Sequence, residues 1–96
     1  MEVFIFARFH ARPAEEERVK QALQEVVPPT QDEEGCLSIH VFRSIRDPQV
    51  FYLHSRWRSE EAFETHTRLP HTARFVQRVE FLLDHKVEAQ RCTMIQ

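Results

Sequence analysis

The chain has 96 residues, a formal net charge of −2, 29% charged residues and a single glycine. This length predicts one domain, residues 1–96, and the composition argues against disorder and against a turn-rich β-sandwich. The basic residues are scattered, so the concentrated basic face that nucleic-acid binding requires is absent.

The start of the chain, MEVFIF, lacks the charged beginning and long apolar stretch of a signal peptide. No segment approaches the ~20 apolar residues that span a bilayer. We therefore expect a cytoplasmic protein without a membrane partner. Cys36 and Cys92 are too few and too distant for a zinc knuckle or a redox motif, and we expect reduced thiols.

The first half of the chain predicts a strand and a helix. Residues 3–10 alternate between two largely apolar sets, which is typical of a strand covered on both sides. Pro13 and the glutamates at 15–17 favour a helix start. Apolar residues then recur at helical spacing, and Pro28-Pro29 is expected to end the helix. These apolar residues are Val19, Ala22, Leu23, Val26 and Val27.

The second half predicts two strands, a broken helix and a last strand. Residues 37–43 and 50–57 read as strands joined by a hairpin loop at 46–49. Ser59 caps a short helix that runs toward Thr67, and Pro70 separates it from a longer one. The longer helix carries an apolar face made of Phe75, Val76, Val79, Leu82 and Leu83. A last strand over about residues 86–94 alternates imperfectly, which suggests a bulge.

The predicted order is β-α-β-β-α-β. It favours a ferredoxin-like α+β fold, a four-stranded antiparallel sheet with both helical units on one face. The second and fourth strands are then opposite edges, so Cys36 and Cys92 lie far apart. Eight Phe, one Trp and one Tyr exceed what a small monomer easily buries, since a chain of this size buries only roughly 60–65% of its surface. A second copy of the chain is the natural cover for the open sheet face.

The stretch ETHTRLPH, residues 64–71, holds two histidines five positions apart. Two histidines that bind one metal from a helix need a spacing of four, whereas a spacing of five turns the second by about 140°. Pro70 could bend that angle back, but no carboxylate or cysteine stands at a helpful offset as third ligand. We therefore expect no metal there. We expect a helix break that also places His66 and His71 at the mouth of a pocket.

Three segments together resemble a known family. EEGC at 33–36, FYLHSRW at 51–57 and SEEAFETHTRLPH at 59–71 resemble the antibiotic biosynthesis monooxygenase domain, and the resemblance covers nearly the whole chain. It implies a dimeric α+β barrel, hence a homodimer. Known members include cofactor-free quinol monooxygenases, enzymes that oxidise polyketide phenols, haem-degrading monooxygenases and an isomerase of a phosphorylated sugar derivative.

The chain also departs from the family pattern. Members often read Tyr-Glu-Arg-Trp at the end of the third strand, where this chain has His54, Ser55, Arg56 and Trp57. The chain has no asparagine, and its last helix has no histidine. Haem degradation, which uses both in that branch, is therefore not expected. The phenol-oxidising branch also uses an asparagine, so its mechanism cannot be transferred residue by residue.

A cofactor-free oxygenase must deprotonate a quinol or phenol, stabilise the anion, hold the ring against an apolar wall and admit molecular oxygen. The chain offers candidates for each task. The base candidates are His66, His71, His54 and His40, and the donor candidates are Arg8 and Trp57. An interface ion pair is the equal alternative for Arg8, and plain core packing is the equal alternative for Trp57. The substrate-binding candidates are His40, Phe51, Phe63 and Phe75. His10 and His85 fall at element ends and are expected to be exposed.

Three functions remain open from the sequence. The first is a cofactor-independent monooxygenase of a small quinol-like or phenolic molecule, with His66 or His71 as base. The second is an isomerase of a small oxo compound, in which two histidines pass a proton between carbons. The third is a non-catalytic dimeric ligand-binding or accessory module, favoured by Ser55 and the missing asparagine.

Overall fold

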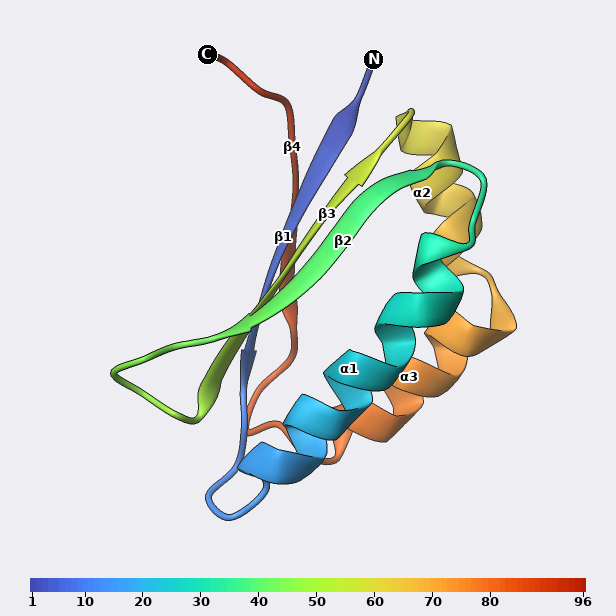
Figure 1. Cartoon of the computed structure of the whole chain (residues 1–96). Coiled ribbons are helices and arrows are strands. Elements are labelled where there is room, and N and C mark those ends of the chain that lie inside the picture. The colour runs from blue at the N-terminus through green and yellow to red at the C-terminus, as the bar shows by residue number, and fades with distance from the viewer.

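The computed structural model describes residues 1–96, and its seven elements follow the predicted order. They are arranged as one sheet with the helices packed along one side (Figure 1). The elements are β1 (Val3–His10), α1 (Glu16–Gln31), β2 (Cys36–Arg43), β3 (Val50–Trp57), α2 (Glu60–Thr67), α3 (Pro70–Glu80) and β4 (Glu88–Cys92).

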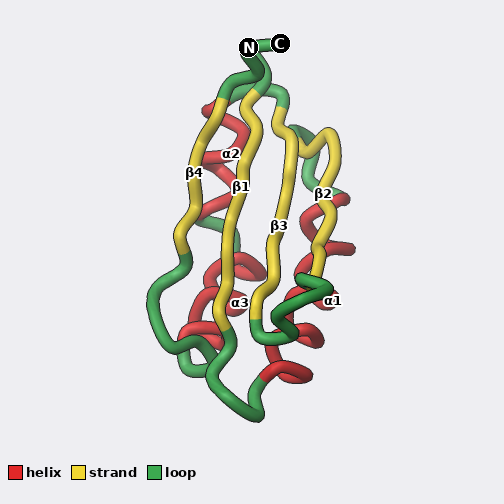
Figure 2. Tube along the Cα trace, turned by 90° about the vertical axis from the view of Figure 1, so that its left-hand side faces the viewer, coloured by secondary structure: helices red, strands yellow, loops and turns green.

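The sheet is antiparallel, with strand order β2-β3-β1-β4. Figure 2 shows the strands in front and all three helices behind them, so one sheet face has no helix over it. This is the predicted ferredoxin-like α+β fold. Cys36 and Cys92 lie on opposite edge strands and are both free thiols, as expected.

Side chains alternate across the sheet and build the core on the helix side. Along β1, Val3, Ile5, Ala7 and Phe9 are buried beneath the helices, whereas Phe6 on the other face is 51% exposed. The sequence predicted a strand covered on both sides. Within a single chain, β1 is covered on the helix side only.

The predicted end of the first helix at the prolines is wrong. α1 continues through Pro28 and Pro29 to Gln31. Each proline removes one donor, so the carbonyls of Gln24 and Glu25 lose their helical partners. Both residues are exposed, and water can satisfy those carbonyls. The extra turn matters because it buries Thr30 completely.

The break in the second helical unit is confirmed. Ser59 Oγ accepts from the Ala62 amide at 3.1 Å and begins α2, while Pro70 is the first residue of α3. α3 is shorter than predicted: it ends at Glu80, and Leu83 instead pairs with Ala11 in an isolated β-bridge.

The last strand is also shorter than predicted. Its pairing with β1 runs without a shift from Glu88 to Cys92, so the structure has no bulge there. No helix in the chain has the length and apolar character needed to cross a membrane.

Candidate functional site

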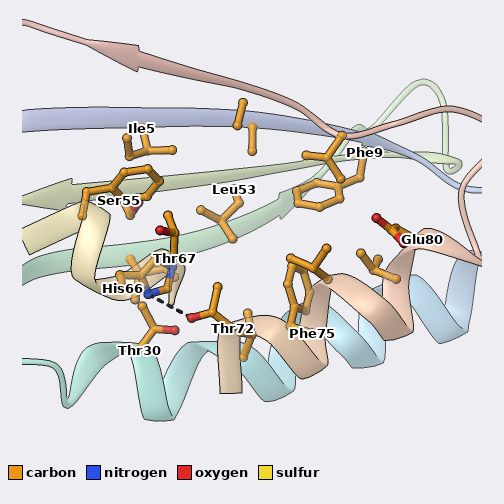
Figure 3. Close-up of a pocket in the computed structure, with 18 of the residues that line it drawn as sticks. Ile5, Phe9, Thr30, Leu53, Ser55, His66, Thr67, Thr72, Phe75 and Glu80 are labelled. Carbon is orange, nitrogen blue, oxygen red and sulfur yellow. Dashed lines mark hydrogen bonds between the residues drawn. The ribbon is translucent and has the colours of Figure 1, made fainter. Parts of the chain in front are cut away.

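A cavity of about 410 Å³ lies between the helix side of the sheet and the three helices (Figure 3). Most of its wall is apolar. Ile5, Phe9 and Leu53 line it from the sheet, and Phe63 and Phe75 line it from α2 and α3. A cavity of this size and polarity suits a small aromatic molecule.

His66 contributes an imidazole to the cavity wall from α2. Its side chain is only 13% exposed. The ring packs against Trp57, with centroids 4.6 Å apart, and against Phe63 at 5.6 Å. The aromatic contacts hold the ring in one orientation at the polar end of an otherwise apolar wall.

Glu33 joins His66 to His71. Its Oε2 lies 2.8 Å from Nδ1 of His66 and 2.7 Å from Nε2 of His71. An ionised carboxylate can only accept, so each of these ring nitrogens carries the hydrogen. In neutral His66 this leaves Nε2, which has no partner within the chain, as the basic nitrogen.

This arrangement supplies a carboxylate that no helpful offset in the sequence had indicated. Glu33, His66 and His71 offer ligand atoms within 4.8 Å of one another, and all three are half-buried. The carboxylate comes from the segment after α1, so its offset from the histidine motif gave no local signal.

The only glycine of the chain explains how that segment reaches α2. A Cβ at Gly35 would lie 2.3 Å from Cβ of Ala62, so no larger residue allows this close approach. The backbone amide of Arg58 donates to the Gly35 carbonyl at 2.9 Å and fixes the segment at the end of β3. Glu33 is thereby placed within hydrogen-bond distance of both histidines.

Four residues with hydroxyl groups line the same cavity, Thr67 among them. Thr72 Oγ lies 3.3 Å from His66 Nδ1 (Figure 3), and Ser55 Oγ accepts from Trp57 Nε1 at 2.9 Å. Thr30 Oγ is buried and has no hydrogen-bond partner. A buried hydroxyl without a partner is costly, and a ligand oxygen or water in the cavity would relieve that cost.

Several predicted site residues face away from the cavity. Arg8, His40 and His54 occupy the sheet face without helices, because they fall on the opposite phase from the buried residues. Nδ1 of His54 lies 3.0 Å from the Ile5 carbonyl oxygen, and its ring stacks on that of Phe6 with centroids 4.5 Å apart. The structure therefore places His40 and His54 outside the pocket that holds His66, and for Arg8 it leaves the alternative of an interface ion pair.

Two further candidates lie in the core. Phe51 is 2% exposed and packs in the main apolar cluster, and Trp57 is 1% exposed with its N–H bound to Ser55. Trp57 therefore supports His66 from behind and does not line the cavity. Phe63 and Phe75 do line it, as expected. Sequence reasoning missed Glu33, Thr30 and Thr72. Only Glu33 had a signal, because it begins the EEGC segment.

Cys36 lies near this cluster as an unreactive thiol. Burial raises its pKa, and the negative charge of Glu33 raises it further. The thiol therefore stays protonated near neutral pH, which argues against a nucleophilic role.

The comparisons with known proteins agree with this fold. The sequence profile of the antibiotic biosynthesis monooxygenase family matches residues 2–78. The protein named "Putative monooxygenase Rv0793" from Mycobacterium tuberculosis is 32% identical over 85 residues, which cover 88% of this chain and 83% of the relative.

Solved structures of similar proteins have the same fold. The structure of Rv0793 superposes with a TM-score of 0.94 at 27% identity, covering 100% of this chain and 97% of that one. PA3566 from Pseudomonas aeruginosa superposes with a TM-score of 0.91 at 27% identity, covering 99% and 95%. The chain belongs to the antibiotic biosynthesis monooxygenase family.

Proposed function

We propose that this protein is a cofactor-independent monooxygenase that oxidises a small quinol-like or phenolic substrate, with His66 as the general base. One observation carries the proposal. His66 stands in the wall of an apolar cavity of about 410 Å³ while Glu33 holds its Nδ1 at 2.8 Å. A base with a fixed tautomer beside an apolar, aromatic-lined chamber is what deprotonation of a bound phenol requires.

In the proposed reaction Nε2 of His66 takes the hydroxyl proton of a quinol. The resulting anion gives its electrons to molecular oxygen, and one oxygen atom bonds to a ring carbon. The second oxygen atom leaves as water with two hydrogens of the quinol, so the products are a hydroxyquinone and water. The quinol is the only reductant needed, which is why no redox cofactor enters the balance.

The imidazolium formed on His66 lies beside the Glu33 carboxylate, which stabilises its positive charge. His71 donates to the same oxygen at 2.7 Å and keeps the carboxylate in place. His71 is therefore a positioning residue in this proposal, because it does not line the cavity.

The cavity hydroxyls provide donors for the substrate oxygens. Thr30 has an unused hydroxyl, and Ser55 keeps its own hydrogen while it accepts from Trp57. Phe63 and Phe75 offer faces for the ring. A small aromatic molecule with a hydroxyl group beside His66 and its ring against these phenylalanines matches this distribution of polar and apolar groups.

The two alternative functions fit less well. A phosphorylated substrate for an isomerase requires a cluster of cations, and Lys86 is the only cationic residue in the cavity lining. A non-catalytic module predicts histidines that face solvent, whereas His66 is half-buried against the cavity. An isomerase of an uncharged oxo compound remains the second candidate, because the Glu33–His66 pair can also move a proton between carbons.

We also propose that the protein works as a homodimer through the sheet face without helices. That face exposes Phe6, Phe42 and Tyr52, which are 51%, 52% and 44% exposed. Light scattering should give a mass near twice 11.5 kDa. A stable monomer would contradict the dimer.

Oxygen uptake tests the function. Untagged protein, freed of metal with a chelator, is supplied with a panel of benzohydroquinones, naphthohydroquinones and phenols. We expect enzyme-dependent uptake of one O₂ per quinone product, with no uptake from the isomerase alternative. Absence of uptake above the His66→Gln background across the whole panel would contradict the monooxygenase.

A further inference from the structure

A second cluster of two histidines and a carboxylate lies outside the cavity. His10 ends β1, and Asp84 and His85 follow α3. Nδ1 of His10 contacts one carboxylate oxygen of Asp84, and Nδ1 of His85 contacts the other. The two imidazole rings stack with centroids 5.7 Å apart and an interplanar angle of 20°. All three ligand atoms lie within 4.8 Å of one another.

These two segments are held together by hydrogen bonds that do not involve the side chains of the cluster. The Asp84 amide donates to the His10 carbonyl at 3.1 Å, and Ala11 pairs with Leu83 in a β-bridge. Arg12 adds two bonds, from its amide to the Leu82 carbonyl and from Nε to the Leu83 carbonyl. The cluster is therefore preorganised by main-chain contacts, so a ligand need not order it.

The ion-pair partners of Asp84 differ from those of two other surface carboxylates, Glu25 and Glu60. Glu25 pairs with Arg78, and Glu60 pairs with Arg91, so each has a permanent cation. The ion-pair partners of Asp84 are His10 and His85 alone. Asp84 therefore has no Lys or Arg partner that a bound cation would have to displace.

We propose that His10, Asp84 and His85 form a binding site for a divalent transition-metal ion, with Zn²⁺ as the best match. Two imidazole nitrogens and one carboxylate oxygen are ligands that zinc prefers, and water can complete a tetrahedral set. With metal–ligand bonds of ~2.0–2.1 Å the ligand atoms of such a site are about 3.3 Å apart, which this cluster reaches by small side-chain rotations. The ion would tie the end of β1 to the segment after α3.

Solvent access favours this site over the buried one. Side chains here are 24%, 39% and 45% exposed for His10, Asp84 and His85, so a hydrated ion can approach and keep water ligands. In the buried cluster both histidines converge on one oxygen of Glu33, whose side chain is 11% exposed. An ion entering there would have to lose its water, whereas an ion at the surface cluster can keep part of it.

Calorimetric titration of untagged, metal-stripped protein with ZnCl₂ tests the proposal and needs no substrate, so its outcome is separate from that of the oxygenase. We expect one Zn²⁺ per chain and a rise in thermal midpoint, since the ion binds the folded chain. His85→Gln and Asp84→Asn should each weaken binding by at least the roughly 10–100-fold that loss of an outer-shell partner costs. Titration with Co²⁺ should give the intense visible absorption of a tetrahedral site.

The controls separate this cluster from the chain's other histidines. His40→Gln, on the exposed sheet face, and His71→Gln, in the buried cluster, should bind Zn²⁺ as the wild type does. Retained binding in His85→Gln, loss of binding in His71→Gln, or no binding by the wild type would each overturn the proposal. Circular dichroism confirms that every variant compared is folded.

Discussion

The same three chemical groups occur twice in this molecule, as Glu33 with His66 and His71 and as Asp84 with His10 and His85. In the first cluster both rings share one carboxylate oxygen, the side chains are 11–20% exposed, and one ring lines a cavity. In the second the rings take separate oxygens, the side chains are 24–45% exposed, and none of the three residues lines that cavity.

This difference shows that residue type alone does not determine chemistry. Burial beside an apolar chamber gives the first cluster a base that can reach a substrate, and exposure gives the second a place for a hydrated cation. The following predictions test that division of roles.

The largest expected effect is on turnover. His66→Gln removes the proposed base and should lower the rate of quinol-dependent oxygen uptake by about 10²–10⁴-fold. His10→Gln makes the same change in the surface cluster and should leave that rate within a factor of about two. A similar loss in both variants would show that the clusters do not differ in the way the geometry indicates.

Gly35→Ala should act on the buried cluster through packing. The added Cβ would meet Ala62 at 2.3 Å, so the segment that carries Glu33 must shift. Overpacking of this kind costs about 1–3 kcal/mol in the free energy of unfolding. Urea denaturation measures it, and zinc binding at the surface cluster should be unchanged in the folded variant. An unaltered urea midpoint would mean that the segment yields without cost.

Cys36 can report the charge of Glu33. Burial and then the Glu33 carboxylate raise the pKa of this thiol, so less thiolate is present at pH 8 than for an exposed cysteine. In a Cys92→Ser background, Glu33→Gln should speed the reaction with Ellman's reagent, whereas Asp84→Asn should not. Equal rates in all three proteins would argue against an ionised Glu33 beside the thiol.

The smallest effect concerns acid stability. The pKa of Asp84 is lowered in the folded chain, so its contribution to stability is present above the unfolded pKa of about 3.9 and is lost as the pH falls through the folded value. The difference in urea midpoint between wild type and Asp84→Asn should therefore shrink from pH 5 toward pH 2.5. A difference that widens on acidification would contradict the lowered pKa.

Much of the fold followed from local sequence patterns. Alternation gave β1 and β3, Ser59 and Pro70 gave the broken helical unit, and the element order gave the ferredoxin-like sheet. The end of α1 was the main error, because a proline pair near an exposed helix end costs little when water replaces the lost backbone bonds. Buried Thr30 sits in that extra turn.

The candidate site was only partly predictable. His66, Phe63 and Phe75 could be selected because they sit on one helical unit with recognisable spacing. His40 and His54 were candidates for the same site as His66, although a strand sends alternate residues to opposite faces. The sequence did not say which face would receive the helices.

The sequence by itself determined the element order, the family and the histidine-containing helix break, since each depends on residues a few positions apart. Only the tertiary structure decided which carboxylate meets which imidazole. Glu33 reaches His66 and His71 across 33 and 38 residues, and His10 reaches Asp84 across 74. Contacts of that separation depend on how whole elements pack, which no local periodicity records.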